Sequence, residues 1–116
     1  MNSEDLKRRT KNFAHECVKL ALSLPENVVG WHIRKQLIRS STSVAANYRA
    51  ACHGQTKASF ISKISIVIEE CDETEFWIEF IEEENLLPHF RLSSLKTEAH
   101  ELSSIFIATR KSSQKN

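Results

Sequence analysis

Positively charged side chains recur at helical spacing in the first half of the chain. Steps of 4, 3, 4, 3 and 4 connect Lys35, Arg39, Thr42, Ala46, Arg49 and His53, and Arg34 is adjacent to this stripe. On a helix, this spacing places the cations on one face, where they can follow a phosphate backbone with salt-dependent affinity. The residues predicted to contact RNA or DNA are therefore Arg34, Lys35, Arg39, Arg49 and His53.

The alternative interpretation of this stripe is a solvated face that pairs with an acidic helix. Residues 64–88 contain nine Asp/Glu and no Lys/Arg, whereas residues 25–63 contain six Lys/Arg and one Asp/Glu. These opposite charges either neutralise each other between neighbouring helices or produce separate basic and acidic surfaces. One face of the first predicted helix either extends the basic patch or only aids solubility; it carries Arg8, Lys11, His15 and Lys19.

Three other clusters of reactive side chains lack the neighbouring residues that a metal site or a catalytic nucleophile requires. The acidic run from Glu69 to Glu75 has no histidine at the Glu-x-x-His spacing of di-iron bundles, and it is interpreted as a solvated helix face. The Cys/His pairs at 15–17 and 52–53 do not have zinc-ligand spacing. The hydroxyls of residues 40–43 have no glycine-rich loop or nucleophile elbow to support catalysis. We therefore predict a protein that is not an enzyme and has no cofactor and no metal site.

Four amphipathic helices must position these side chains. The 116 residues include only 2 glycines and 2 prolines, and 41% are hydrophobic, which is typical of a helical globular domain. Apolar residues recur every three or four positions in segments interrupted near Pro25, Gly54 and Pro88, with Gly54 as a C′ residue and Thr56 as an N-cap. The predicted helices span about 4–23, 28–53, 57–84 and 90–110, before a frayed polar tail. Their short connections favour an all-α, antiparallel up-down-up-down four-helix bundle in which residues 1–116 form a single domain.

Cysteine content and hydropathy predict a cytoplasmic protein. Its three cysteines, an odd number, do not form a disulfide framework, and Cys17 and Cys71 fall on apolar stripes, which predicts buried, reduced thiols. No signal peptide follows the N-terminal charges and no apolar run of about 18 residues occurs, so we expect no contact with a membrane.

The third predicted helix has more apolar surface than one packing seam requires. Beyond its apolar stripe, a second flank carries the residues predicted to form a homo-oligomer interface, Ile61, Ile68, Phe76, Trp77 and Phe80. The alternative is that the most central helix of any bundle is apolar over a wide arc. A rival hypothesis for the function is a protein-interaction or assembly module with no nucleic-acid role, which would bind a protein partner through this flank or the acidic face.

The sequence from Gln36 to Ala51, followed by Phe60–Ile81 with its Glu69-Glu70-Cys71-Asp72-Glu73 motif, resembles the ribosomal RNA intervening-sequence proteins. The resemblance extends from Phe13 to about Phe106. It implies a four-helix bundle that assembles into a ring, typically a homopentamer. A related branch includes the accessory protein of diversity-generating retroelements, a basic pentamer for which binding of nucleic acid and of a reverse transcriptase has been inferred.

One departure from the family pattern makes the second helix more basic. Members often carry Asn-Ile-Ala-Glu-Gly where this chain has Asn47-Tyr48-Arg49-Ala50-Ala51, so a glutamate is lost and Arg49 is gained. Asn47 matches the pattern and is expected to make a structural hydrogen bond between helices. The leading hypothesis is thus a non-catalytic homo-oligomeric bundle that binds RNA or DNA through its basic second helix.

Overall fold

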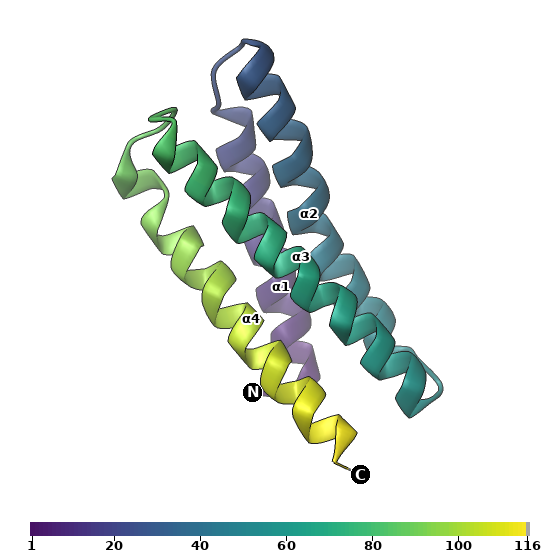
Figure 1. The fold of residues 1–116 in the computed structure, drawn as a ribbon. Coiled ribbons are helices and arrows are strands. Elements are labelled where there is room, and N and C mark those ends of the chain that lie inside the picture. The colour runs from purple at the N-terminus through teal and green to yellow at the C-terminus, as the bar shows by residue number, and fades with distance from the viewer. Residues whose placement is uncertain (116) are drawn as a thin grey trace.

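The computed structural model describes residues 1–115 and contains four α-helices (Figure 1). These are α1 (Ser3–Leu22), α2 (Val28–Cys52), α3 (Lys57–Glu83) and α4 (Ser93–Gln114), with a short 3₁₀ helix, η1 (His89–Arg91), before α4. The helices run alternately up and down, and the described residues contain no strand. This confirms the predicted all-α four-helix bundle.

Polar caps define where the first three helices begin. Asn2 and Asp5 form a capping box at α1, the side chain of Asn27 accepts a hydrogen bond from Gly30 N at 2.9 Å, and Thr56 accepts one from Ser59 N at 3.0 Å. The predicted ends of these three helices agree with the structure to within one residue. Gly54 has the predicted C′ position after α2, but without the left-handed backbone of a glycine cap.

The predicted bounds of α4 are wrong at both ends. Pro88 is followed by η1, so the regular helix begins at Ser93 and not near residue 90. The helix also continues to Gln114, through part of the segment predicted to be frayed. No glycine or proline interrupts this segment, and Lys111 in the last turn interacts favourably with the helix dipole. Asn116 lies outside the described residues.

The four apolar stripes meet in one core. Its largest fully buried side chains include Ile33, Leu37, Ile64, Ile78 and Phe106. The predicted burial of Cys17 and Cys71 is confirmed, and burial raises the pKa of each thiol to about 12.

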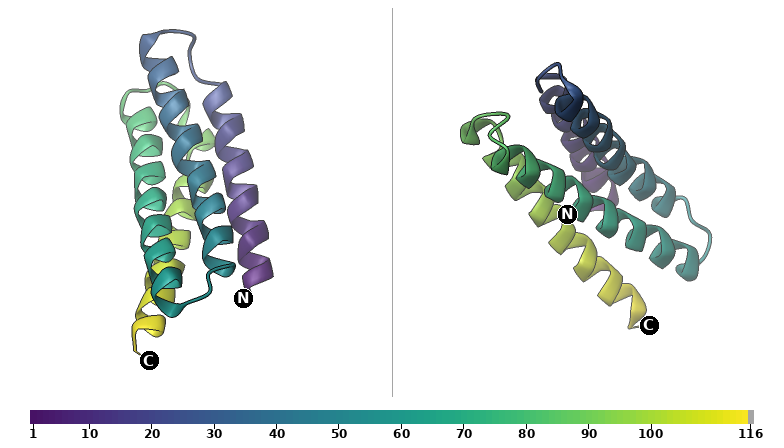
Figure 2. Two further views of the ribbon diagram at one scale, coloured as in Figure 1. Left: turned by 90° about the vertical axis from the view of Figure 1, so that its right-hand side faces the viewer. Right: turned by 45° about the horizontal axis from the view of Figure 1, so that its top comes forward.

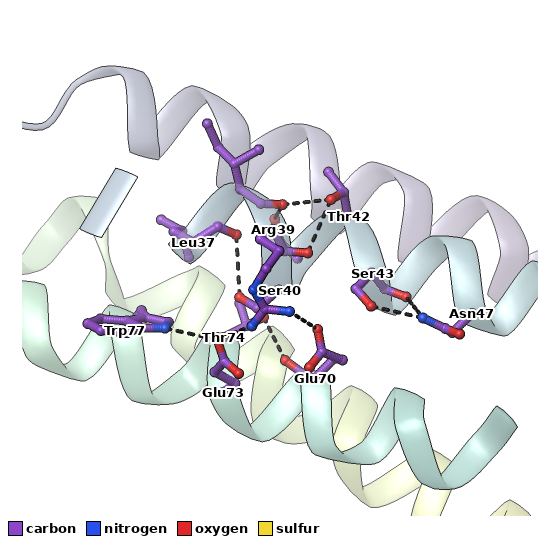
Figure 3. Close-up of polar contacts among 12 residues, drawn as sticks. Leu37, Arg39, Ser40, Thr42, Ser43, Asn47, Glu70, Glu73, Thr74 and Trp77 are labelled. Carbon is purple, nitrogen blue, oxygen red and sulfur yellow. Dashed lines mark hydrogen bonds and ion pairs between the residues drawn. The ribbon is translucent and has the colours of Figure 1, made fainter. Parts of the chain in front are cut away.

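Buried hydroxyls explain the unusual serine run of α2. Ser40 is completely buried, and its Oγ lies 2.9 Å from Thr74 Oγ1 of α3 (Figure 3). Thr74 Oγ1 also lies 2.7 Å from the carbonyl oxygen of Glu70, so the pair is satisfied without water. Small side chains allow α2 and α3 to approach closely at this point. The Asn47 amide, predicted to join two helices, instead donates within α2, to Ser43 Oγ at 2.8 Å and to the Ser43 carbonyl oxygen at 3.0 Å.

The bundle is polarised along its long axis. Both termini and the α2–α3 connection lie at one end, and the other two connections lie at the opposite end (Figure 2). The half with the termini comprises residues 1–12, 41–70 and 104–115, which include ten Lys/Arg and four Asp/Glu. The opposite half, residues 13–40 and 71–103, includes six Lys/Arg and eleven Asp/Glu. None of the described helices is long and apolar enough to span a membrane.

Candidate nucleic-acid interface

Arg34, the first residue of the predicted nucleic-acid set, holds the α1–α2 connection together. Its guanidinium donates to the carbonyl oxygens of Ala21 and Leu24, at 3.1 and 3.0 Å, and to the carboxylate of Glu26 at 3.1 Å. The Ala21 carbonyl belongs to the last turn of α1, where the helix dipole favours a cation, and the Leu24 carbonyl lies just beyond it. Arg34 is therefore committed to a structural role within the bundle.

Arg39 pairs with the acidic helix, as the alternative interpretation of the stripe predicts. Its guanidinium donates to Glu70 at 2.8 Å and to Glu73, both on α3 (Figure 3). Hydrogen bonding to Glu73 and Glu70 raises the pKa of Arg39, against the opposing effect of desolvation. The Glu70 side chain is only 13% exposed, so Arg39 compensates a carboxylate with little access to water.

The remaining members of the set, Lys35, Arg49 and His53, are exposed. None of the three forms an ion pair within the described part of the chain. Lys35 and Arg49 are 14 residues apart on α2, which corresponds to about 21 Å along a helix. Lys35 is therefore at a distance from the other two, near the acidic end of the bundle.

Arg49 and His53 face cations of α1 across a groove of about 770 Å³ between the two helices. We call the small uncharged side chains that line it its floor: Ala14, Val18, Thr42, Ala45 and Ala46. Its rims carry Lys7, Arg8, Lys11 and His15 from α1, with Arg49 and His53 from α2. Glu4 is the one acidic residue among those that line the groove. We refer to this feature as the basic groove.

The charge of the basic groove is only weakly compensated. Lys7 and Arg8 form ion pairs within the first turns of α1, with Glu4 at 3.0 Å and with Asp5 at 2.6 Å. Such exposed pairs are worth little and exchange readily with other anions. Lys11 and Arg49 have no ion-pair partner among residues 1–115, so the groove offers cations on both rims.

The sequence predicts the cations of both rims but not the groove between them. The cationic face of α1 and the stripe of α2 each follow from helical spacing, yet their relative rotation depends on how the helices pack. Lys7 was missed because it lies beside the α1 face identified from the sequence. The small residues Ala14, Ala45 and Ala46 give the groove its depth, and in sequence they are ordinary helix formers.

The five residues predicted to form an oligomer interface do not share one exposed face. Ile68, Trp77 and Phe80 are partly buried against the core of the bundle, and Ile61 is half-buried. Phe76 is the exception, because 51% of its surface is exposed. The wide apolar arc of a central helix therefore accounts for part of this set.

The described residues offer no arrangement of metal ligands. Within residues 1–115, no group of three or more His, Cys, Asp or Glu side chains is placed to hold a metal ion. His89 pairs with Glu82, and His100 Nδ1 lies 3.6 Å from a carboxylate oxygen of Glu75, so each of these histidines has a single acidic partner.

Comparison with known proteins gives matches of nearly full length to a family profile and to a solved structure. The profile of the family described as 23S rRNA-intervening sequence protein matches residues 4–108. A crystal structure from Bacteroides thetaiotaomicron, of a protein with unknown function from the S23 ribosomal protein family, superposes with a TM-score of 0.87. The two sequences are 30% identical, and the match covers 96% of this chain and 99% of that one. No curated protein matches the chain significantly.

Proposed function

The chain belongs to the 23S rRNA-intervening sequence protein family, and on this basis we propose that it is a non-catalytic, cytoplasmic helical module that binds RNA or DNA through its basic groove. The observation that carries the proposal is the convergence of cations from α1 and α2 on the two rims of one groove. Cations on both sides of a channel can contact successive phosphates of one strand, whereas a single stripe contacts them from one side.

The floor of the basic groove supports contact with the backbone and not with base edges. Alanine, valine and threonine side chains offer little hydrogen bonding and no aromatic ring for stacking, so the floor does not distinguish one base from another. Their small size would let a sugar-phosphate strand lie deep enough for Lys11 and Arg49 to reach it from opposite sides. The proposed binding is therefore electrostatic and largely independent of sequence.

The polarity of the bundle supports the same site. The groove extends toward the end of the molecule that has an excess of Lys/Arg, so the field of the whole half attracts a polyanion toward it. The acidic half repels the same polyanion. The strand would thus meet the bundle at the end that contains both termini.

The test is a fluorescence anisotropy titration of a labelled 20-nucleotide RNA and of a 20-base-pair DNA duplex. Charge reversal of both rims, Lys11→Glu with Arg49→Glu, should abolish binding at low salt. The matched control is Lys19→Glu with Lys35→Glu, which makes the same charge change on the same two helices outside the groove. We expect the control to bind almost as tightly as the unaltered chain.

Two outcomes would contradict the proposal. One is an absence of binding at low salt by the unaltered chain to either probe. The other is an equal loss of affinity in the rim variant and in its control, because that result would indicate an effect of net charge alone.

We also propose self-association, for which the apolar residues around the α1–α2 connection offer a surface. Four large side chains there are exposed, namely Leu22, Val28, Val29 and Trp31. Light scattering on protein purified with and without nuclease would measure the mass of the assembly and any nucleic acid that accompanies it. A monomer at all accessible concentrations would exclude self-association.

A further inference from the structure

The outward face of α3 carries a stripe that lies outside the basic groove, and of its residues only Phe80 packs against the core. Steps of 3, 4, 4 and 3 connect Glu69, Asp72, Phe76, Phe80 and Glu83. This spacing places the five residues on one helix face over about 21 Å, with two aromatic side chains between carboxylates at both ends. We refer to them as the outer stripe.

Phe76 gives the outer stripe an exposed and well-positioned apolar centre. Its ring is half exposed, yet it contacts Trp77 edge-to-face at 4.9 Å between centroids and lies 6.0 Å from the ring of Phe80. Trp77 is fixed in turn by donating its indole N–H to Glu73 at 3.2 Å, and by an edge contact with His32 of α2 (Figure 3). A partner that covers Phe76 therefore meets a ring whose position is already restricted, which lowers the entropic cost of binding.

The carboxylates of the outer stripe are not compensated within the bundle. Glu69, Asp72 and Glu83 are exposed, and none of them forms an ion pair with another described residue. Their neighbours Glu70 and Glu73, by contrast, are paired with α2. The outer stripe thus combines an apolar centre with unbalanced negative charge, a composition that favours a partner of opposite charge and repels a phosphate backbone.

We propose that the outer stripe binds an amphipathic, Lys/Arg-rich helix of a partner protein. Two helices that pack over four turns can bury Phe76 and Phe80 against apolar side chains of the partner. Cations at both ends of the partner's face would then meet Asp72 and Glu83, and an arginine can in addition stack on an exposed aromatic ring.

The face of α2 between Lys35 and Arg49 in a second copy of this chain offers the charge but little apolar surface. Its exposed cations on α2, Lys35 and Arg49, are separated on their outward face by Thr42 and Ala46. These short side chains cover far less of an aromatic ring than leucine or methionine does. This face of α2 therefore matches the outer stripe poorly, whereas a Lys/Arg-rich helix with long apolar side chains supplies both the charge and the apolar cover. Binding here is independent of the proposed nucleic-acid site.

The test uses a fluorescein-labelled 18-residue helical peptide with leucines at the centre of one face and arginines at both of its ends. A peptide of the same composition, with leucines and arginines on opposite faces, is the reference. Fluorescence anisotropy should show tighter binding of the first peptide. Phe76→Ser and Asp72→Lys should each weaken that binding about tenfold, as expected for residues at the centre of an interface.

Matched variants separate this surface from general effects of charge and hydrophobicity. Phe90→Ser removes another exposed phenylalanine, and Glu16→Lys reverses an exposed acid on α1, so neither should change peptide binding. Lys11→Glu with Arg49→Glu should also bind the peptide as tightly as the unaltered chain. Circular dichroism verifies that each variant is folded.

Three results would overturn the proposal. The first is equal affinity for the two peptides, and the second is unchanged binding by Phe76→Ser. The third is a light-scattering mass that falls to that of a monomer on Phe76→Ser, because the occupant of the outer stripe would then be a second copy.

Discussion

The salt dependence of nucleic-acid binding tests the basic groove quantitatively. Four permanent cations line it, Lys7, Arg8, Lys11 and Arg49. If each neutralises one phosphate of a DNA duplex, the plot of log affinity against log salt has a slope of about −3.6. Affinity would then fall about 150-fold between 50 and 200 mM salt.

Removal of one cation from each rim should halve this dependence. With Lys11→Ala and Arg49→Ala, two phosphate contacts remain, the slope falls to about −1.8, and the same change in salt costs only about 12-fold in affinity. The control, Lys19→Ala with Lys35→Ala, removes the same charge from the same helices and should keep a slope of about −3.6.

The measurement is a set of anisotropy titrations with the 20-base-pair duplex at four or more salt concentrations. It also separates the groove from the single stripe, because Lys35 belongs to the stripe and not to the groove. If the control lost as much slope as the rim variant, the cations would act through net charge. A slope near zero for the unaltered chain would refute phosphate contact altogether.

Three further predictions concern the bundle. A Cβ at Gly30 would lie 1.8 Å from the carbonyl oxygen of Pro25, so Gly30→Ala should destabilise the fold by about 1 to 3 kcal/mol in urea unfolding, although alanine favours helices. Arg39→Ala should cost about 1 to 3 kcal/mol by the same measurement because it leaves the poorly exposed Glu70 without its cation, and it should leave the salt slope unchanged. The two buried thiols have raised pKa values, so their contribution to the free energy of unfolding is present below the ordinary thiol pKa and is lost as pH rises toward 12. A thiol reagent at neutral pH should label only Cys52 until the chain unfolds.

The positions of the helices followed from local chemistry. Capping by Asn27 and Thr56 depends only on nearby residues, because each side chain accepts a hydrogen bond from the backbone N–H three residues further along the chain. The end of α4 was harder to predict since no residue near 110 breaks a helix, and a polar composition alone does not end one. A helix ends at a helix-breaking residue such as glycine or proline, or where its packing against other helices ends. Only the helix-breaking residues can be recognised in the sequence.

The candidate site was less predictable because it depends on the rotation of each helix in the bundle. Spacing alone placed Arg39 and Arg49 on one stripe, yet they lie about 80° apart around the helix axis at 100° per residue. That difference turns Arg39 toward α3 and Arg49 toward α1. The buried contact between Ser40 and Thr74 fixes which side of α2 faces α3, and no property of Ser40 alone reveals its partner.

The internal pairing of two arginines also explains how one alternating charge pattern produces two surfaces. Arg34 is hydrogen-bonded to the connection after α1, and Arg39 is paired with α3. The acidic half of the bundle therefore keeps few cations that could attract a polyanion. Asp72 and Glu83 of the outer stripe remain uncompensated there, while Lys11 and Arg49 remain available near the opposite end. A phosphate backbone and a basic helix would therefore approach different parts of the same bundle without competing. Placing a positive charge in the acidic half, with Asp72→Lys, should weaken peptide binding and leave the salt slope of nucleic-acid binding unchanged. A steeper slope in that variant would show that the two surfaces are not independent.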